Sequence, residues 1–344
     1  MKRFFILILF VCVCSLVFYS CDSCNRNKEK KHAVKAEKIK EIRAKINTPI
    51  FRYEKDLFSL NLKDFPNELA RLQPKYPFFL NGDIRDPKNQ QQLYAFITDP
   101  ITKEIYDETL KQFPNIDDLK RGLDDGFSYY NYYFPQDKIP TVYTYVSSLD
   151  YELPIKYTDS VLIIALDMYL GKSCKYYPQI GMPLYKTIRC SKEYIVVDCF
   201  KEIAFSHIKY DNARTTLLDE MIMEGKRLYF AESMLPNESD SILIGYTNAK
   251  LNWAQQNEAN MWGYIIDKNL LYSPDSKIIM KFINDAPFTS FFSNDSPGRA
   301  GVWIGWQIVR AYMNNNKNAN LVDMLKEPSG QKILNLSKYK PKKF

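Results

Sequence analysis

The sequence predicts one mainly helical α+β domain, in which a small antiparallel sheet is followed by a helical half. Runs of β-branched and aromatic residues at 141–146, 152–155 and 160–166 are typical of short strands bounded by turns. Apolar residues three and four apart recur before these runs and again after Gly181, which predicts helices on both sides of the sheet. No Gly/Ser-rich linker, charge block or repeat interrupts residues 46–337, so we expect a single globular unit there.

The expected helices begin with an N-terminal layer over residues 67–113. Beyond the strands, the three-and-four spacing predicts helices over 194–209, 215–234, 249–269, 276–284 and 296–314. The last of these follows Ser296 and Pro297, which are favoured at the N-cap and first helical position, respectively.

The N-terminus carries the features of a secretory signal. Lys2 and Arg3 precede an apolar run over 4–19, which is short for a transmembrane helix and ends at Ser20 and Cys21. We interpret residues 1–20 as a lipoprotein signal peptide and Cys21 as the lipidated first residue; Cys24 is a poorer candidate. An uncleaved N-terminal anchor is the alternative, and in either case the body is exported and held at a membrane.

Basic residues gather at the two ends of the chain. Residues 26–45 contain nine Lys or Arg against three Glu, and four more lysines lie in the tail 338–344. Because these ends account for more than the formal net charge of +7, the body itself carries net negative charge. We therefore expect 21–45 to be a solvated, lipidated tether near anionic head groups, and we expect no nucleic-acid binding.

Three cysteines lie in the body, at positions 174, 190 and 199. In an exported protein the odd number predicts one disulfide and one spare thiol. No C-x-x-C pair falls among them, so we expect no zinc knuckle.

The segment from Asp219 to Met223 keeps the frame of the zinc-protease motif H-E-x-x-H without its histidines. In that motif two histidines hold Zn²⁺ and the glutamate acts as general base, but here only Glu220 remains. The whole chain has two histidines, His32 and His207, so a site of two or three imidazoles cannot be built. We expect no catalytic residue, no metal and no cofactor, with Asp219, Glu220, Met223, Glu224 and Glu258 as vestigial candidates.

The helix expected over 215–234 has one apolar stripe and a charged edge. Glu220 and Glu224 are neighbours on that edge, where they could share a proton or hold a hard cation; alternatively, Lys226 and Arg227 neutralise them on a solvated face. Gly225 costs the helix about 1 kcal/mol relative to Ala, which indicates a close crossing by another element.

A second small-residue pattern follows Pro297. Gly301 and Gly305 lie four apart, which allows close helix packing flanked by Trp303 and Trp306. Arg299 lies in the first turn, where the positive helix end disfavours it, so we expect an ion pair with Glu220 or Glu224.

Three segments together resemble the GldB family of gliding-motility-associated lipoproteins of Bacteroidota. They are residues 218–229 (LDEMIMEGKRLY), residues 262–264 with 270–273, and residues 297–310. The resemblance implies an envelope lipoprotein of the gliding machinery and the linked type IX secretion system, with other envelope proteins as partners. The chain is also similar to zinc proteases that carry H-E-x-x-H, E-G and P-x-R-x-G-x-x-x-G segments, which implies a degenerate zincin-like fold with Glu258 at the place of a third ligand.

We therefore expect an accessory lipoprotein at the periplasmic face of the outer membrane that acts by protein contact. One alternative is a metal-dependent hydrolase with Asp219, Glu224 and Glu258 as ligands. Another is a glycan- or peptide-binding module whose cleft is formed by Arg299 and by the tryptophans Trp253, Trp262 and Trp303.

Overall fold

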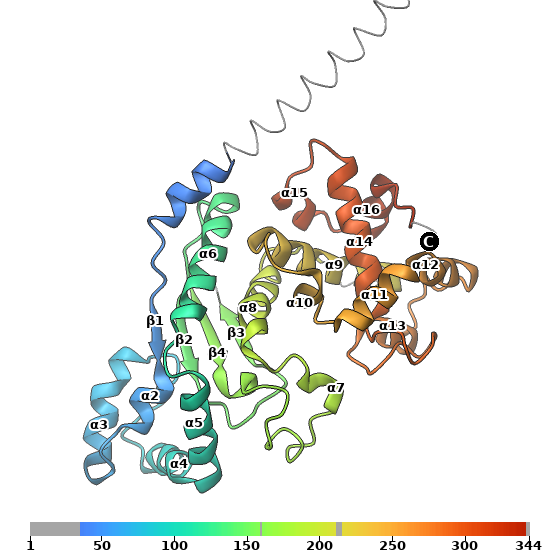
Figure 1. Ribbon diagram of the computed structural model, residues 1–344. Coiled ribbons are helices and arrows are strands. Elements are labelled where there is room, and N and C mark those ends of the chain that lie inside the picture. The colour runs from blue at the N-terminus through green and yellow to red at the C-terminus, as the bar shows by residue number, and fades with distance from the viewer. Residues whose placement is uncertain (1–34, 159, 211–214, 342–344) are drawn as a thin grey trace, which may run out of the picture.

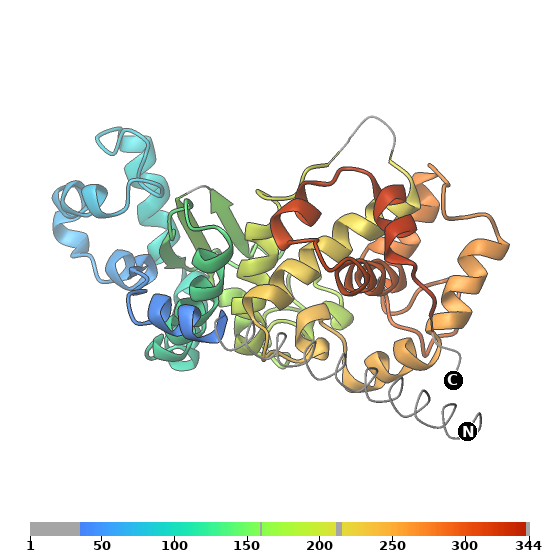
Figure 2. The ribbon, with the colours of Figure 1, turned by 90° about the horizontal axis from the view of Figure 1, so that it is seen from above.

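The computed structural model describes residues 35–158, 160–210 and 215–341, and Figure 1 shows their arrangement. The predicted class, mainly helical α+β, is confirmed: one four-stranded sheet lies between two groups of helices. Seen from above, the N-terminal helices and the C-terminal helical half lie at opposite ends of the molecule, with the sheet between them (Figure 2). Cys21 and the signal segment lie outside the described residues.

The sheet is mixed, so the expected antiparallel sheet is wrong for most of its pairs. Its strands β1 (Ile50–Arg52), β2 (Thr141–Tyr145), β3 (Ile155–Thr158) and β4 (Val161–Ala165) lie in the order β1-β2-β4-β3. β2 is parallel to both β1 and β4, and only the β3–β4 pair is antiparallel. The chain reverses twice between β2 and β4, by way of β3, which brings β4 back parallel to β2. β1 has only three residues, and the sequence pattern does not predict it.

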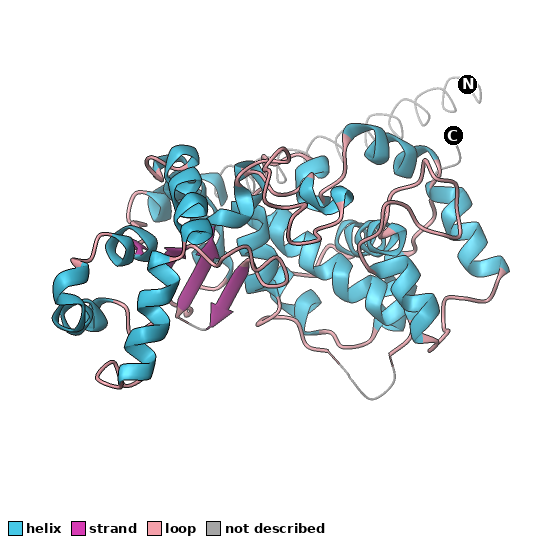
Figure 3. Ribbon diagram, turned by 90° about the horizontal axis from the view of Figure 1, so that it is seen from below, coloured by secondary structure: helices cyan, strands magenta, loops and turns pink. Residues whose placement is uncertain are grey.

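The two faces of the sheet belong to different cores because successive side chains on a strand point to opposite sides. Tyr143 and Val161 pack with the N-terminal helices α2 (Tyr53–Phe58), α3 (Phe65–Leu72) and α4 (Pro87–Thr98). Val142, Leu162 and Ile164 instead join the larger core of the helical half. Figure 3 shows the strands between these two groups of helices.

The expected helical layer over 67–113 is present but interrupted. It comprises α3, α4 and α5 (Pro100–Gln112), with residues 76–86 outside any α-helix. A long helix that the sequence analysis missed, α6 (Asp117–Tyr133), follows it. Gly122 and Gly126 of α6 face Val196 and Phe200 of α8 (Ile195–Ala204), where a β-carbon would clash with those side chains. The two glycines lower the helix propensity of this segment, which is why the sequence pattern did not predict the helix, and they allow the side chains of α8 to approach the backbone of α6.

The helical half contains short α7 (Leu184–Thr187) and then α9 (Leu217–Met234), α10 (Asp240–Ile244) and α11 (Asn248–Gln256). It continues with α12 (Glu258–Asp267), α13 (Ser276–Ile283), α14 (Ala300–Asn315), α15 (Leu321–Lys326) and α16 (Gly330–Ser337). The single helix expected over 249–269 is two helices, α11 and α12, separated at Asn257.

The start of α14 differs from the prediction. The helix begins at Ala300, and its N-cap is Arg299 in a left-handed conformation with φ of 57°. Ser296 is buried instead and its hydroxyl accepts the N–H of Thr289 at 3.2 Å, while the carbonyl of Pro297 accepts a second bond from Thr289. These contacts hold 296–298 as a loop before the helix.

Residues 35–43, within the expected tether, are helical and contact the body. Ile39 is buried, the Lys35 amine donates to the hydroxyl of Tyr133 at 2.6 Å, and Arg43 pairs with Asp125 at 2.5 Å. The folded body therefore extends upstream of residue 46. No helix in the described part of the chain has the length and apolar character needed to cross a membrane.

The expected disulfide is absent, because Cys174, Cys190 and Cys199 are all free thiols. Cys190 instead packs its sulfur 3.7 Å from that of Met182, and Cys199 is fully buried on α8. Burial raises the pKa of both thiols, which keeps them protonated at neutral pH.

Candidate functional site

The N-terminus of α9 uses Asp219 for capping. The Thr216 hydroxyl lies 2.6 Å from an Asp219 carboxylate oxygen and also accepts the Asp219 N–H, and the Thr216 N–H donates to the same carboxylate. This is a capping box, which satisfies backbone donors that a helix start leaves open. Asp219 therefore stabilises the helix at the position where a zinc protease would carry its first histidine.

Glu220 and Glu224 have separate partners. The hydroxyl of Tyr210 donates to Glu220, and Arg227 holds both oxygens of Glu224 at 2.8 and 3.0 Å. Neutralisation by Arg227 is thus confirmed for Glu224. The expected role of Lys226 is wrong: its amine is buried and donates to the carbonyls of Leu325 and Glu327.

The close helix crossing predicted from Gly225 is confirmed, and its partner is α14. A β-carbon at Gly225 would lie 2.8 Å from the backbone nitrogen of Trp306, and one at Gly305 would lie 3.0 Å from Cα of Met221. The backbones of α9 and α14 therefore touch directly. Gly301 serves a second crossing, against Phe282 of α13.

The proposed vestigial ligands point into different parts of the molecule. Asp219 and Met223 line a hollow of about 230 Å³ beside α16, whereas Glu224 lines a larger cavity. Glu258 accepts bonds from the indole N–H of Trp303 at 3.1 Å and from the Tyr339 hydroxyl at 2.9 Å. Among the described residues, no three His, Cys, Asp or Glu side chains are grouped so as to hold a metal ion.

His207 is also committed elsewhere. Its ring lies 4.2 Å from that of Phe134 and stacks on Phe230, and its Nε2 is 3.0 Å from the hydroxyl of Tyr130. Burial lowers its pKa, so this imidazole is neutral at pH 7 and contributes to an aromatic cluster.

The tryptophans that we expected to share one cleft do not all meet. Trp253 packs on Phe292 with ring centroids 6.2 Å apart, while Trp262 packs edge-on against Tyr339 at 5.3 Å. Trp303 is only 2% exposed and is linked to Tyr339 through Glu258. Two of the three thus belong to one cluster, in which Trp303 is a buried packing residue.

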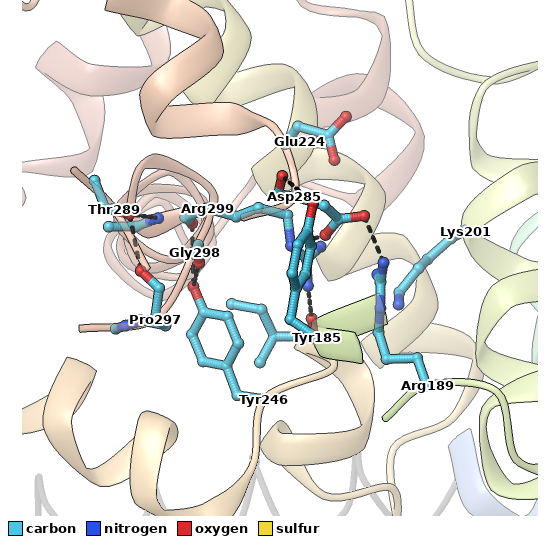
Figure 4. A network of polar contacts seen from close by, with 12 residues as sticks. Tyr185, Arg189, Lys201, Glu224, Tyr246, Asp285, Thr289, Pro297, Gly298 and Arg299 are labelled. Carbon is cyan, nitrogen blue, oxygen red and sulfur yellow. Dashed lines mark hydrogen bonds and ion pairs between the residues drawn. The ribbon is translucent and has the colours of Figure 1, made fainter. Parts of the chain in front are cut away.

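A charged cavity of about 590 Å³ lies between α7–α8, α9 and the loop that precedes α14. At its centre, the carboxylate of Asp285 is bound by Arg189 at 2.6 Å and by the Arg299 Nε at 2.9 Å. Figure 4 shows the two guanidinium groups converging on Asp285. The expected ion pair of Arg299 with Glu220 or Glu224 is therefore wrong, although Glu224 lines the same cavity.

The left-handed backbone of Arg299 directs its side chain to this cavity. Its Nη2 also donates to the carbonyl of Ile244 at 2.5 Å, and the Tyr246 hydroxyl holds the carbonyls of Gly298 and Arg299 at 2.9 and 3.1 Å. Burial would raise the pKa of Asp285, but Arg299 and Arg189 outweigh burial and hold that pKa below its usual value. Asp285 thus remains a carboxylate at neutral pH.

Lys201, on α8, places an amine in the same cavity. The side chain is 8% exposed and lies 3.3 Å from Asp198, whose carboxylate also accepts the Tyr169 hydroxyl at 3.2 Å. Burial lowers the pKa of Lys201 to about 8; Asp198 opposes this shift, and nearby arginines reinforce it. The cavity can therefore bind an oxyanion through guanidinium and ammonium donors.

The sequence predicts Arg299 and Glu224 as candidate residues but does not single out Arg189, Lys201 or Asp285, and all five line this cavity. These three come from separate segments, near α7, on α8 and after α13, and none stands in a recognisable spacing with the others. One signal for Asp285 was present in the sequence. Arg299 lies at the start of α14, where the positive helix end disfavours an arginine, and this indicates a nearby carboxylate.

No curated protein and no solved structure matches the chain. A family model does: the one described as Gliding motility protein GldB matches residues 32–341. That match gives no support to the likeness to zinc proteases, and neither does the separation of Asp219, Glu224 and Glu258. The match spans nearly the whole described chain, and the chain accordingly belongs to the GldB family of gliding motility proteins.

Proposed function

We propose that this gliding-motility-associated protein is a lipid-anchored, non-catalytic accessory component of the motility machinery and the linked type IX secretion system. It would face the periplasm and act by contact with other envelope proteins. Family membership supports the association with motility. The lipid anchor rests on the sequence around Cys21.

The observation that carries the non-catalytic role is the use of the α9 motif in packing. Asp219 closes the capping box, and Glu220 accepts a bond from Tyr210. One turn later, the helix backbone contacts α14 at Gly225. Asp219 and Glu220 thus each have a structural partner, which favours a scaffold over a hydrolase.

The test is complementation of a strain that lacks the gene. Glu220→Gln should restore colony spreading, or export of type IX cargo in a host that does not glide, because the amide still accepts the Tyr210 bond. A Glu220→Gln protein that is folded and normally abundant but fails to complement would overturn the proposal. Metal content of the full-length protein, purified in detergent without a histidine tag, gives a second test: near-stoichiometric transition metal would restore the hydrolase alternative.

The anchor is tested separately with radiolabelled palmitate. Incorporation should be lost in Cys21→Ala and retained in Cys24→Ala, since only the first residue of the mature chain is acylated. Labelling that survives Cys21→Ala would contradict the anchor site.

A further inference from the structure

Among the described residues, the lining of the charged cavity has five basic and five acidic side chains, but two guanidinium groups converge on one of its carboxylates. Arg189 and Arg299 share the single carboxylate of Asp285. A carboxylate balances one guanidinium, so this group of three carries a net charge of about +1 in a half-buried setting, where charge is screened less than in water.

Arg189 and Lys201 are the side chains with N–H groups available to bind a ligand. Arg299 is engaged by Asp285 and the carbonyl of Ile244. Within the described part of the chain, by contrast, Arg189 donates one side-chain hydrogen bond, through Nη2 to Asp285, and Lys201 pairs with Asp198. A guanidinium has five N–H groups and an ammonium has three, so both can bind a further oxyanion.

The rest of the lining limits what that oxyanion can be. Glu152, Glu202 and Glu224 line the cavity beside the cations. Burial raises the pKa of Glu202, which marks its environment as unfavourable to additional negative charge. These carboxylates repel a dianion such as phosphate more strongly than a ligand with one carboxylate, because the repulsion grows with the charge of the ligand.

Apolar side chains are exposed next to the cavity. Leu153 lines it and is 57% exposed, and Leu184, which precedes the lining residues Tyr185 and Lys186 on α7, is 80% exposed. Large apolar side chains held at the surface beside polar donors are typical of sites that recognise peptides. The volume of about 590 Å³ admits a few residues of extended chain.

We propose that the cavity binds a peptide segment of a partner protein, with one carboxylate held by Arg189 and Lys201 and a neighbouring apolar side chain on Leu153 and Leu184. The inference rests on the proposed function, contact with other envelope proteins, and names the chemistry by which one such contact is made. Charge complementarity at Arg189 and Lys201 selects the acidic group, and the exposed leucines contribute apolar burial.

The test is calorimetric titration of the full-length protein in detergent with two pools of acetylated pentapeptides. Both pools have amidated termini; the first has a central Asp and the second a central Asn, with all other positions varied among uncharged residues. Inorganic phosphate is the third probe. We expect saturable binding of the first pool and no comparable binding of the second pool or of phosphate.

Arg189→Gln and Lys201→Gln should each weaken binding of the acidic pool at least about tenfold, the loss expected when a charged hydrogen bond is removed. Because Arg189 also supports Asp285, Leu184→Asp is a further variant: its side chain is exposed, so folding is preserved while the acidic ligand is repelled. Lys277→Gln, which removes an exposed charge from α13, is the matched control and should bind as the wild type does.

Equal binding of both pools, tighter binding of phosphate, no binding of the acidic pool, or unchanged binding in all three cavity variants would overturn the inference. Those results leave the proposed function standing, because complementation by Glu220→Gln does not depend on the cavity. Failure of Glu220→Gln would overturn the proposed function instead.

Discussion

The crossing of α9 and α14 gives a direct test of the packing, through Gly305→Ala. A β-carbon at Gly305 would lie 3.0 Å from Cα of Met221 and closer still to its carbonyl oxygen. Overpacking of this kind costs about 1–3 kcal/mol, and the upper end applies because the obstructing atoms belong to a helix backbone that cannot rotate away. Alanine returns about 1 kcal/mol through its higher helix propensity. The net expected loss of unfolding free energy is about 2 kcal/mol.

Gly263→Ala is the control for that measurement. Gly263 lies in α12 with no atom within 4 Å of an added β-carbon, so the same substitution there should gain up to about 1 kcal/mol. Urea unfolding followed by far-ultraviolet circular dichroism would measure both variants. If Gly305→Ala is as stable as the wild type, or as stable as Gly263→Ala, the direct backbone contact between α9 and α14 is refuted.

Three further changes probe buried polar groups. Burial lowers the pKa of Lys226 to about 8, below its unfolded value, so the charged amine destabilises the fold below pH 8. This cost is relieved as the pH rises toward the unfolded pKa. Relative to Lys226→Met, the unfolding free energy of the wild type, measured by urea titration, should therefore increase by up to about 1.4 kcal/mol per pH unit above pH 8. Arg310→Lys should lose about 1–3 kcal/mol of unfolding free energy, because lysine cannot make the forked contact of 2.6 and 2.8 Å with Asp240 or stack on Trp306. A thermal unfolding midpoint within about 1 °C of the wild type would contradict this. Asp167→Asn should lower the unfolding free energy by about 2 kcal/mol, because the fully buried carboxylate accepts hydrogen bonds from the N–H groups of Ser147 and Leu149 and an amide would turn a donor toward one of them. An unchanged urea midpoint would refute that account.

Structural features that are determined by neighbouring residues were predictable from the sequence. Thr216 and the acidic first turn set the start of α9, and the strands at 141–145 and 161–165 follow from runs of β-branched residues. Gly225 indicated a close crossing because no local reason for a glycine exists inside that helix. The helix start and the strands have their physical cause within a few residues of the observed pattern, whereas Gly225 indicates that a crossing exists without indicating its partner, α14.

Features that depend on distant segments were not predictable in this way. β1 has three residues and is a strand because it pairs with β2, about ninety residues later. The left-handed N-cap at Arg299 depends on Tyr246 and Asp285, and it shifted the start of α14 to Ala300 although Ser296 and Pro297 have good local propensities. Tertiary contacts outweighed capping preference at that point.

The charged residues along α9 have distinct structural roles. Aspartate at position 219 is well suited to a helix start, where it completes the capping box with Thr216 and its negative charge is favoured by the helix dipole. One turn further, Glu224 and Arg227 pair with each other at the wall of the charged cavity. Asp219 thus stabilises the start of α9, whereas Glu224 and Arg227 form part of the cavity wall. Glu220 does not line this cavity, so substitutions at Glu220 and at Arg189 are expected to have separable effects.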